Sequence, residues 1–140
     1  MAENMVWDPL RRKNVPLTPE ERVRQWFITV LKDRMQVPLH MMMSEVGMKF
    51  GEGALKKEFR ADIVVYDRRP GPMMIVECKR PDVELTKDVL EQALRYDMVL
   101  DVKYLALTNG NRTIFCERLE DGSISFLEEA PTYMQMLGLE

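Results

Sequence analysis

The feature that most constrains this chain is an apolar stretch that ends directly in charge, MMIVECKRP at residues 73–81. Four consecutive apolar residues favour a strand buried inside a sheet. The stretch nevertheless continues with Glu77 and Lys79, which are two residues apart. Because side chains alternate along a strand, these two charged groups point to the same face. The fold must therefore accommodate a carboxylate and an ammonium group at the end of a buried strand.

A second strand is predicted just before this one, over residues 58–67 (EFRADIVVYD). The turn residues RRPGP at 68–72 connect the two strands, which are therefore expected to pair antiparallel. This pairing places Asp62 at the same end of the sheet as Glu77 and Lys79. Two neighbouring carboxylates repel each other unless a cation lies between them. Oxygen ligands at an open sheet end suit Mg²⁺, which takes one or two carboxylates and keeps several waters.

A less specific interpretation of these residues stays open. The Glu-x-Lys tripeptide is common, and its two charged side chains could emerge into solvent, paired with Asp62 or Arg80. What favours a site is the aspartate that precedes Glu77 by 15 residues, on a neighbouring strand after a turn.

The remaining sequence predicts one α/β domain over residues 18–140, preceded by a flexible N-terminal arm over residues 1–17. A first helix begins with Thr18 as its N-cap and Pro19 at its first position. A first strand covers residues 38–50, and a second amphipathic helix follows over residues 86–100.

The inner face of this second helix is predicted to contain Val89, Ala93, Tyr96 and Leu100. A strand, an Asn-Gly turn and another strand follow over residues 102–119, and residues 121–129 add at most a short edge strand. The element order is αβββαββ, with a central mixed sheet of four to five strands flanked by helices. The second helix is expected to cross over, so that the strand after it lies parallel to strand 73–79.

Composition excludes several functions. His40 is the only histidine, and the two cysteines, Cys78 and Cys116, form no CxxC pair, so a zinc site is not expected. No apolar run approaches the roughly 20 residues that span a bilayer, and the first residues lack the order of a signal peptide, which predicts a cytoplasmic protein. The net charge of −3 gives no overall basic surface for nucleic acid.

Four segments, RADIVVYD, MMIVECKRP, EQALRYDMVL and YLALTNG, together resemble the N-terminal nuclease domain of type I restriction enzyme R subunits. That domain belongs to the PD-(D/E)xK nuclease superfamily, and the resemblance covers roughly residues 19–117. It implies a restriction-endonuclease-like core that hydrolyses DNA with Mg²⁺ or Mn²⁺. By this resemblance Asp62, Glu77 and the backbone carbonyl of Cys78 bind the metal, and Lys79 acts on the attacking water. This chain has Ala61-Asp62 where the superfamily name gives Pro-Asp, which leaves the aspartate in place.

The second helix adds a match to the Gln-x-x-x-Tyr element of the RecB-like branch, here Gln92 and Tyr96. Residues four apart share one helix face, so both side chains could reach the metal or the nucleic-acid backbone. The alternative is that Tyr96 belongs to the core and Gln92 flanks it. Some superfamily members also use a glutamate of the first helix. Helical phase favours Glu20 for that position and puts Glu21 on the opposite side as a cap, while Glu45 is another candidate.

The first interpretation is therefore a magnesium-dependent endonuclease or exonuclease of the restriction or repair type, acting on DNA. Arg60 and Arg80 flank the predicted site and are candidates for holding phosphates. The sequence contains no GxxxxGK[ST] phosphate loop, so a motor or specificity protein would be supplied in trans. Two alternatives remain: a catalytically silent module of the same fold that binds DNA or protein, and a structural subunit that uses its 12 methionines and N-terminal arm for a protein interface or a homo-oligomer.

Overall fold

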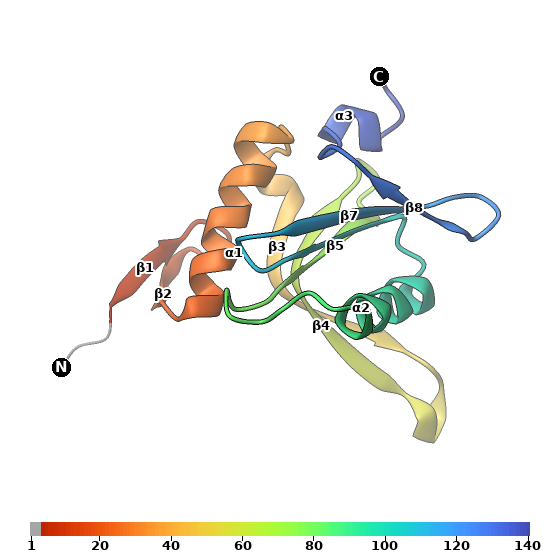
Figure 1. Cartoon of the computed structure of the whole chain (residues 1–140), viewed down its shortest axis with the longest axis horizontal. Helices are drawn as coiled ribbons and strands as arrows, with labels where there is room; N and C mark the ends of the chain where they lie inside the picture. Colours follow the sequence, from red (N-terminus) through yellow and green to blue (C-terminus); the bar gives the residue numbers. More distant parts are fainter. Residues whose placement is uncertain (1–3) are drawn as a thin grey trace.

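A six-stranded mixed sheet with the strand order β3-β4-β5-β6-β7-β8 forms the centre of the molecule (Figure 1). The computed structural model describes residues 4–140. The six strands are β3 (Met42–Phe50), β4 (Lys57–Tyr66), β5 (Pro72–Cys78), β6 (Tyr104–Thr108), β7 (Thr113–Arg118) and β8 (Ile124–Leu127). Neighbours are antiparallel except for β5 and β6, which are parallel. The sheet thus has one strand more than the upper limit predicted, because β8 pairs along β7.

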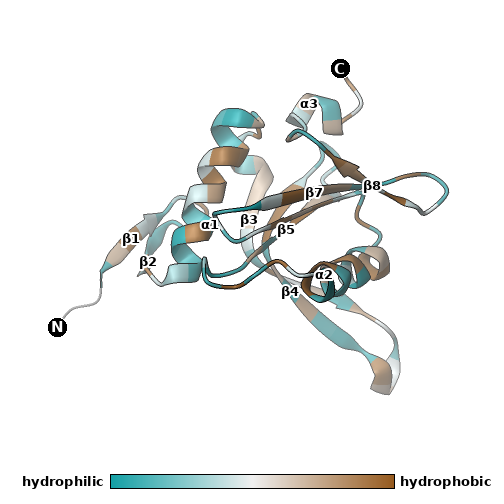
Figure 2. Cartoon of the chain, in the orientation of Figure 1, coloured by the Kyte–Doolittle hydropathy of each residue, from teal (hydrophilic) through white to brown (hydrophobic). Residues whose placement is uncertain are grey.

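Helices cover the two faces of this sheet (Figure 1). Helix α1 (Pro19–Thr29) continues as a π-helical turn at Val30–Arg34, and its residues pack in one apolar cluster with alternate residues of β4 and β5 such as Ile63 and Val76. Helix α2 (Lys87–Leu100) connects β5 to β6 and packs in a second cluster with Val64 and Ile75. Figure 2 shows hydrophobic residues running along β5 between the helices. The predicted crossover is confirmed, since α2 links two parallel strands.

Helix α1 begins where its sequence predicts. The hydroxyl of Thr18 accepts a hydrogen bond from the backbone N–H of Glu21 at 3.1 Å, and Pro19 occupies the first turn. A 3₁₀ turn at Leu39–Met41 then leads into β3, and another at Gly53–Leu55 joins β3 to β4. The short helix α3 (Tyr133–Met136) closes the chain, and the backbone N–H of Tyr133 donates to the carbonyl of Met35 at 2.7 Å.

Residues 4–17 do not form the predicted flexible arm. Strands β1 (Met5–Asp8) and β2 (Lys13–Pro16) pair antiparallel as a separate hairpin beside α1 (Figure 1). Arg11 in its turn binds both Asp8, which is fully buried, and Glu21 of α1. These ion pairs fix the hairpin against the helix. Strands of four residues are too short to show a periodic pattern; residues 1–3 of the predicted arm lie outside the described residues.

The predicted inner face of α2 is only partly correct. Ala93 is buried and Leu100 packs in the same cluster, as predicted, but Leu90 and Leu94 pack there too, and the other buried residue of this helix is Asp97. Tyr96 instead lies against Phe59 of the β3–β4 hairpin, which projects beyond the sheet below α2 (Figure 1). No helix within residues 4–140 is long and apolar enough to cross a membrane.

Candidate active site

Asp62 lies in β4 opposite an irregular position of β3. Ser44 pairs with Ile63 and Val46 with Ala61, so the intervening Glu45, which has a left-handed φ of 57° and is left out of the pairing, lies opposite Asp62 with no extra residue in either strand. The backbone N–H of Cys78 in β5 donates to Oδ2 of Asp62 at 2.7 Å. Burial raises the pKa of this carboxyl to about 6, although the Cys78 hydrogen bond and Arg24 oppose the rise.

Glu77 lies beside Asp62 on the neighbouring strand β5. Ile63 pairs with Val76, so Asp62 and Glu77 occupy the next position along the two strands. Oε1 of Glu77 is buried and has no hydrogen-bond partner among the described residues. Burial, and then the charge of Asp62, raise the pKa of Glu77 to about 8. Two adjacent carboxyls are therefore buried with too little positive charge to keep both ionised.

A cleft of about 270 Å³ opens beside Glu77 between β5, α2 and the β3–β4 hairpin. It is lined by Phe59, Glu77, Lys79, Val89, Gln92, Ala93 and Tyr96. The backbone N–H of Lys79 donates to the carbonyl of Thr108 at 2.8 Å, which continues the pairing of β5 with β6 beyond the end of the strand. The structure thus brings the Glu-x-Lys and Gln-x-x-x-Tyr residues to one cleft.

Tyr96 belongs to the wall of this cleft. Its ring stacks on Phe59 with the centroids 4.3 Å apart and 16° between the planes. Gln92, one helical turn earlier, is exposed and lines the same wall. Tyr96 is half-buried and Gln92 is open to the cleft. The two side chains are therefore neither both buried in the core nor both fully exposed to solvent.

Arg24 is the residue at this site that the sequence did not single out. Its guanidinium is buried and reaches three acids: Glu45 at 2.7 Å, Glu21 at 3.2 Å and Asp62 at 3.9 Å. It also donates to the backbone carbonyl of Asp62 at 3.4 Å. A signal was available, because Arg24 lies next to Val23 and one turn before Phe27, inside the apolar stripe of α1. A charged residue in such a stripe requires a buried partner.

The other candidates have different environments. Glu20 is half-buried, and its charge contributes to raising the pKa values of Asp62 and Glu77. Glu21, predicted to lie opposite the apolar stripe as a cap, is buried because the β1–β2 hairpin covers that side of α1. Arg60 and Arg80 are exposed and pair with Glu45 at 3.5 Å and Asp82 at 3.4 Å. Neither arginine lines the cleft beside Glu77.

The available ligands fit an ion such as Mg²⁺ better than a metal ion whose ligands all come from the protein. Within residues 4–140 no group of three or more His, Cys, Asp and Glu side chains is arranged to hold a metal. Asp62 and Glu77 provide two carboxylates, which is the number that Mg²⁺ takes when water and phosphate complete its shell. The unpartnered oxygen of Glu77 and the raised pKa values of both acids indicate a place where a cation would be stabilised.

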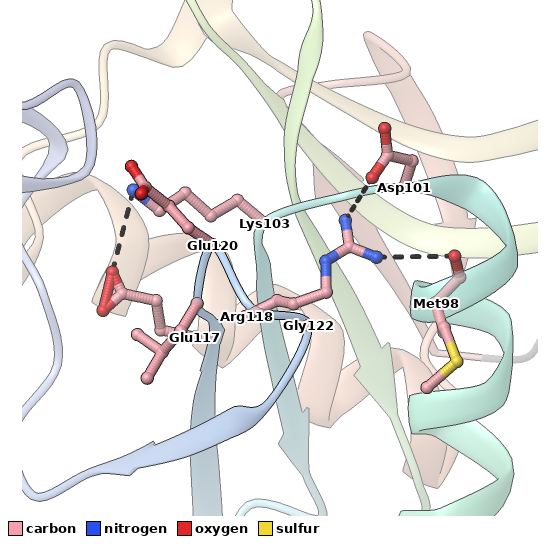
Figure 3. Close-up of a pocket in the computed structure, with 8 residues that line it drawn as sticks. Met98, Asp101, Lys103, Glu117, Arg118, Glu120 and Gly122 are labelled. Carbon is pink, nitrogen blue, oxygen red and sulfur yellow. Dashed lines mark hydrogen bonds and ion pairs between the residues drawn. The ribbon is translucent and has the colours of Figure 1, made fainter.

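A larger cavity, about 630 Å³, lies at the C-terminal end of α2 (Figure 3). Both of its cations are paired, Arg118 with Asp101 at 2.7 Å and Lys103 with Glu117 at 3.8 Å, and Glu120 adds a further acid. None of its lining residues has a buried polar atom without a partner. Size therefore does not identify the active site here, and the smaller cleft beside Glu77 is the better candidate.

Comparisons with known proteins agree with this placement of the fold. The family described as "Type I restriction enzyme R protein N terminus" matches residues 19–131. Among solved structures, the chain is similar to one assigned as a fragment of an HsdR subunit of a type I restriction enzyme from Vibrio vulnificus YJ016, with a TM-score of 0.64 and 20% identity. That match covers 88% of this chain and 25% of the other, so this chain spans about a quarter of its relative's length. No curated protein matches the chain.

Proposed function

Because this chain belongs to the family of type I restriction enzyme R protein N-terminal domains, we propose that it is a metal-dependent nuclease that hydrolyses phosphodiester bonds in DNA. The observation that carries the proposal is the buried, unpartnered Oε1 of Glu77 beside Asp62, at a cleft that also holds Lys79. A purely structural role does not explain this oxygen of Glu77, because burying an unpartnered carboxyl oxygen is destabilising.

The residues present divide the chemistry among them. Asp62, Glu77 and the carbonyl of Cys78 would hold Mg²⁺ or Mn²⁺. The ion would activate a water molecule and offset the charge of the phosphate. The Lys79 ammonium, on the cleft wall beside Glu77, orients that water or stabilises charge that develops on the phosphate oxygens. Arg24 acts through Asp62, whose carboxylate and backbone carbonyl it approaches, and is a positioning residue.

The proposal includes a protein partner. A motor or specificity protein acting with the chain is part of this proposal, because the chain belongs to a family of R-subunit N termini. Gln92 contributes an amide donor to the cleft, where it can contact the DNA backbone, and Tyr96 supports that wall.

The test is cleavage of linear and circular DNA, single- and double-stranded, with Mg²⁺ or Mn²⁺. We expect wild type to cut at least one form, and Glu77→Ala and Lys79→Ala to reduce the rate at least about a hundredfold, the size expected when one group of such a site is removed. The matched control is Glu84→Ala, an exposed acid after β5 that should cut like wild type.

Two results would contradict the proposal. Cleavage that survives in both site variants would locate the activity elsewhere or in a contaminant. Folded wild type that cuts no DNA form with either metal would favour the catalytically silent module.

A further inference from the structure

A second cleft, of about 410 Å³, continues along α2 from the one beside Glu77. It lies between α2 and the projecting β3–β4 hairpin and is lined by Phe50, Lys57, Gln92, Arg95, Tyr96 and Val99. We call it the arm groove. Gln92 and Tyr96 line both clefts, so the arm groove is continuous with the candidate active site.

The charged side chains that line the arm groove are all positive. Lys57 lies on its hairpin wall and Arg95 on its helix wall, and no carboxylate lines it. Among residues 4–140, neither cation takes part in an ion pair, unlike Arg60, Arg80, Lys87 and Arg118. In a chain with a net charge of −3, this is a local concentration of unpaired positive charge. Such a surface attracts an anionic chain.

The remaining lining is aromatic and apolar. Phe50 approaches Tyr96 edge-on, with the ring centroids 6.2 Å apart and 69° between the planes. Both rings are partly exposed, and Val99 beside them is 56% exposed. Cations combined with aromatic faces are the features by which proteins bind single-stranded nucleic acid, since unpaired bases need an apolar surface and phosphates need positive charge.

We propose that the arm groove binds a single-stranded DNA segment adjacent to the phosphate that is cut. Lys57 and Arg95 bind its phosphates, and a base lies against Phe50 and Tyr96. The volume of the arm groove is that of a pocket for a small molecule, which is room for about one nucleotide. The identity of the ligand rests on the proposed nuclease function, whereas the location rests on the charge and shape of the groove.

Binding is measured without cleavage, by fluorescence anisotropy of a labelled single-stranded oligodeoxynucleotide in EDTA. We expect Lys57→Ala/Arg95→Ala to weaken binding about tenfold at 0.1 M salt. For this double variant, the slope of log affinity against log salt should be shallower by about 1.4, because single strands release about 0.7 counterion per phosphate contact and two contacts are lost. Both residues are exposed, so the melting temperature should change little.

The control, Lys49→Ala/Arg69→Ala, also removes one lysine and one arginine. Lys49 pairs with Glu58, next to the Phe50–Lys57 pair, and therefore lies on the opposite face of the hairpin. Arg69 is in the exposed turn before β5. This double variant should keep the affinity within about twofold and most of the salt slope.

The outcomes separate the two proposals. If wild type binds the oligonucleotide and only the groove variant loses affinity, the arm groove stands even if no DNA is cut. If wild type cuts DNA but groove and control variants bind alike, the arm groove is wrong and the nuclease stands. An affinity for duplex equal to that for the single strand, or no binding at all, would also overturn the arm-groove proposal.

Discussion

Asp97 is a buried acid that the proposed reaction does not use. Its side chain is on the inner face of α2, the residue is 2% exposed, and Oδ1 has no hydrogen-bond partner among the described residues. Burial raises its pKa to about 7, against the opposing charge of Arg118. The folded protein thus keeps a proton that the unfolded chain releases near pH 4. Folding stability from this group is present below that pH and is lost as the pH rises towards 7.

We therefore predict that Asp97→Asn stabilises the protein at pH 8 by roughly 2 kcal/mol and changes little at pH 4. The amide has nearly the same shape but cannot ionise. Urea denaturation at the two pH values measures the difference, with the exposed Asp82→Asn as control. Destabilisation of equal size at both pH values would mean that the Asp97 carboxyl makes a favourable interaction in the folded state.

At the level of single residues, the sequence was enough to predict the two acids of the candidate site but not the buried charged residues around them. Strand alternation and a turn were enough to bring Asp62 close to Glu77, because both depend only on local geometry. Arg24 and Asp97 were missed for one reason: both lie in apolar helix stripes, where pattern analysis assigns polar residues to the exposed side. Their burial depends on partners distant in the sequence, such as Glu45 and Asp62 for Arg24.

Among the elements, the β1–β2 hairpin has the most unexpected connection to the site. It precedes the family match, which begins at residue 19. Arg11 of its turn binds Glu21 at 2.5 Å, Glu21 binds Arg24 at 3.2 Å, and Arg24 reaches Asp62. An alternating series of charges therefore joins the hairpin to the candidate active site.

Arg11→Ala should destabilise the protein by roughly 2 kcal/mol, because it leaves the buried acids Asp8 and Glu21 with less compensating charge. The backbone amide of the buried Val15 in β2 should also exchange hydrogen faster. Chemical denaturation and hydrogen exchange measure the two effects. Lys13→Ala, an exposed change in the same hairpin, should produce neither. Unchanged stability and exchange in Arg11→Ala would show that the ion pairs do not hold the hairpin in place.

Element type followed from the sequence more reliably than pairing at the sheet edges. The Thr18 cap of α1, the strands β3, β4 and β5, and the Asn-Gly hairpin were predicted because each has a strong local pattern. The four-residue strands β1, β2 and β8 lack that length, and what forms them is pairing with a neighbouring strand. The inner face of α2 was partly misassigned because the β3–β4 hairpin covers a second side of that helix.

At the scale of the whole molecule, the two ends of the sheet differ in how their charged side chains are compensated. At one end, Lys103 and Arg118 of the larger cavity are each paired with an acid, whereas the opposite end contains Asp62 and Glu77 with too little positive charge to keep both ionised. The restriction-endonuclease-like fold is shared with the related Vibrio structure at a TM-score of 0.64. Buried acids left uncompensated are destabilising, and sites of this kind are usually retained for function.

The central claim is that Asp62 and Glu77 together hold a divalent cation, and calorimetric titration of Mn²⁺ into the metal-free protein tests it most directly. We predict one binding site per chain in wild type and in the control Glu84→Gln, with the heat signal lost in Glu77→Gln. A melting temperature in EDTA no lower than that of wild type would show that each variant is folded. Absence of binding in wild type, or binding that Glu77→Gln leaves intact, would contradict the metal site.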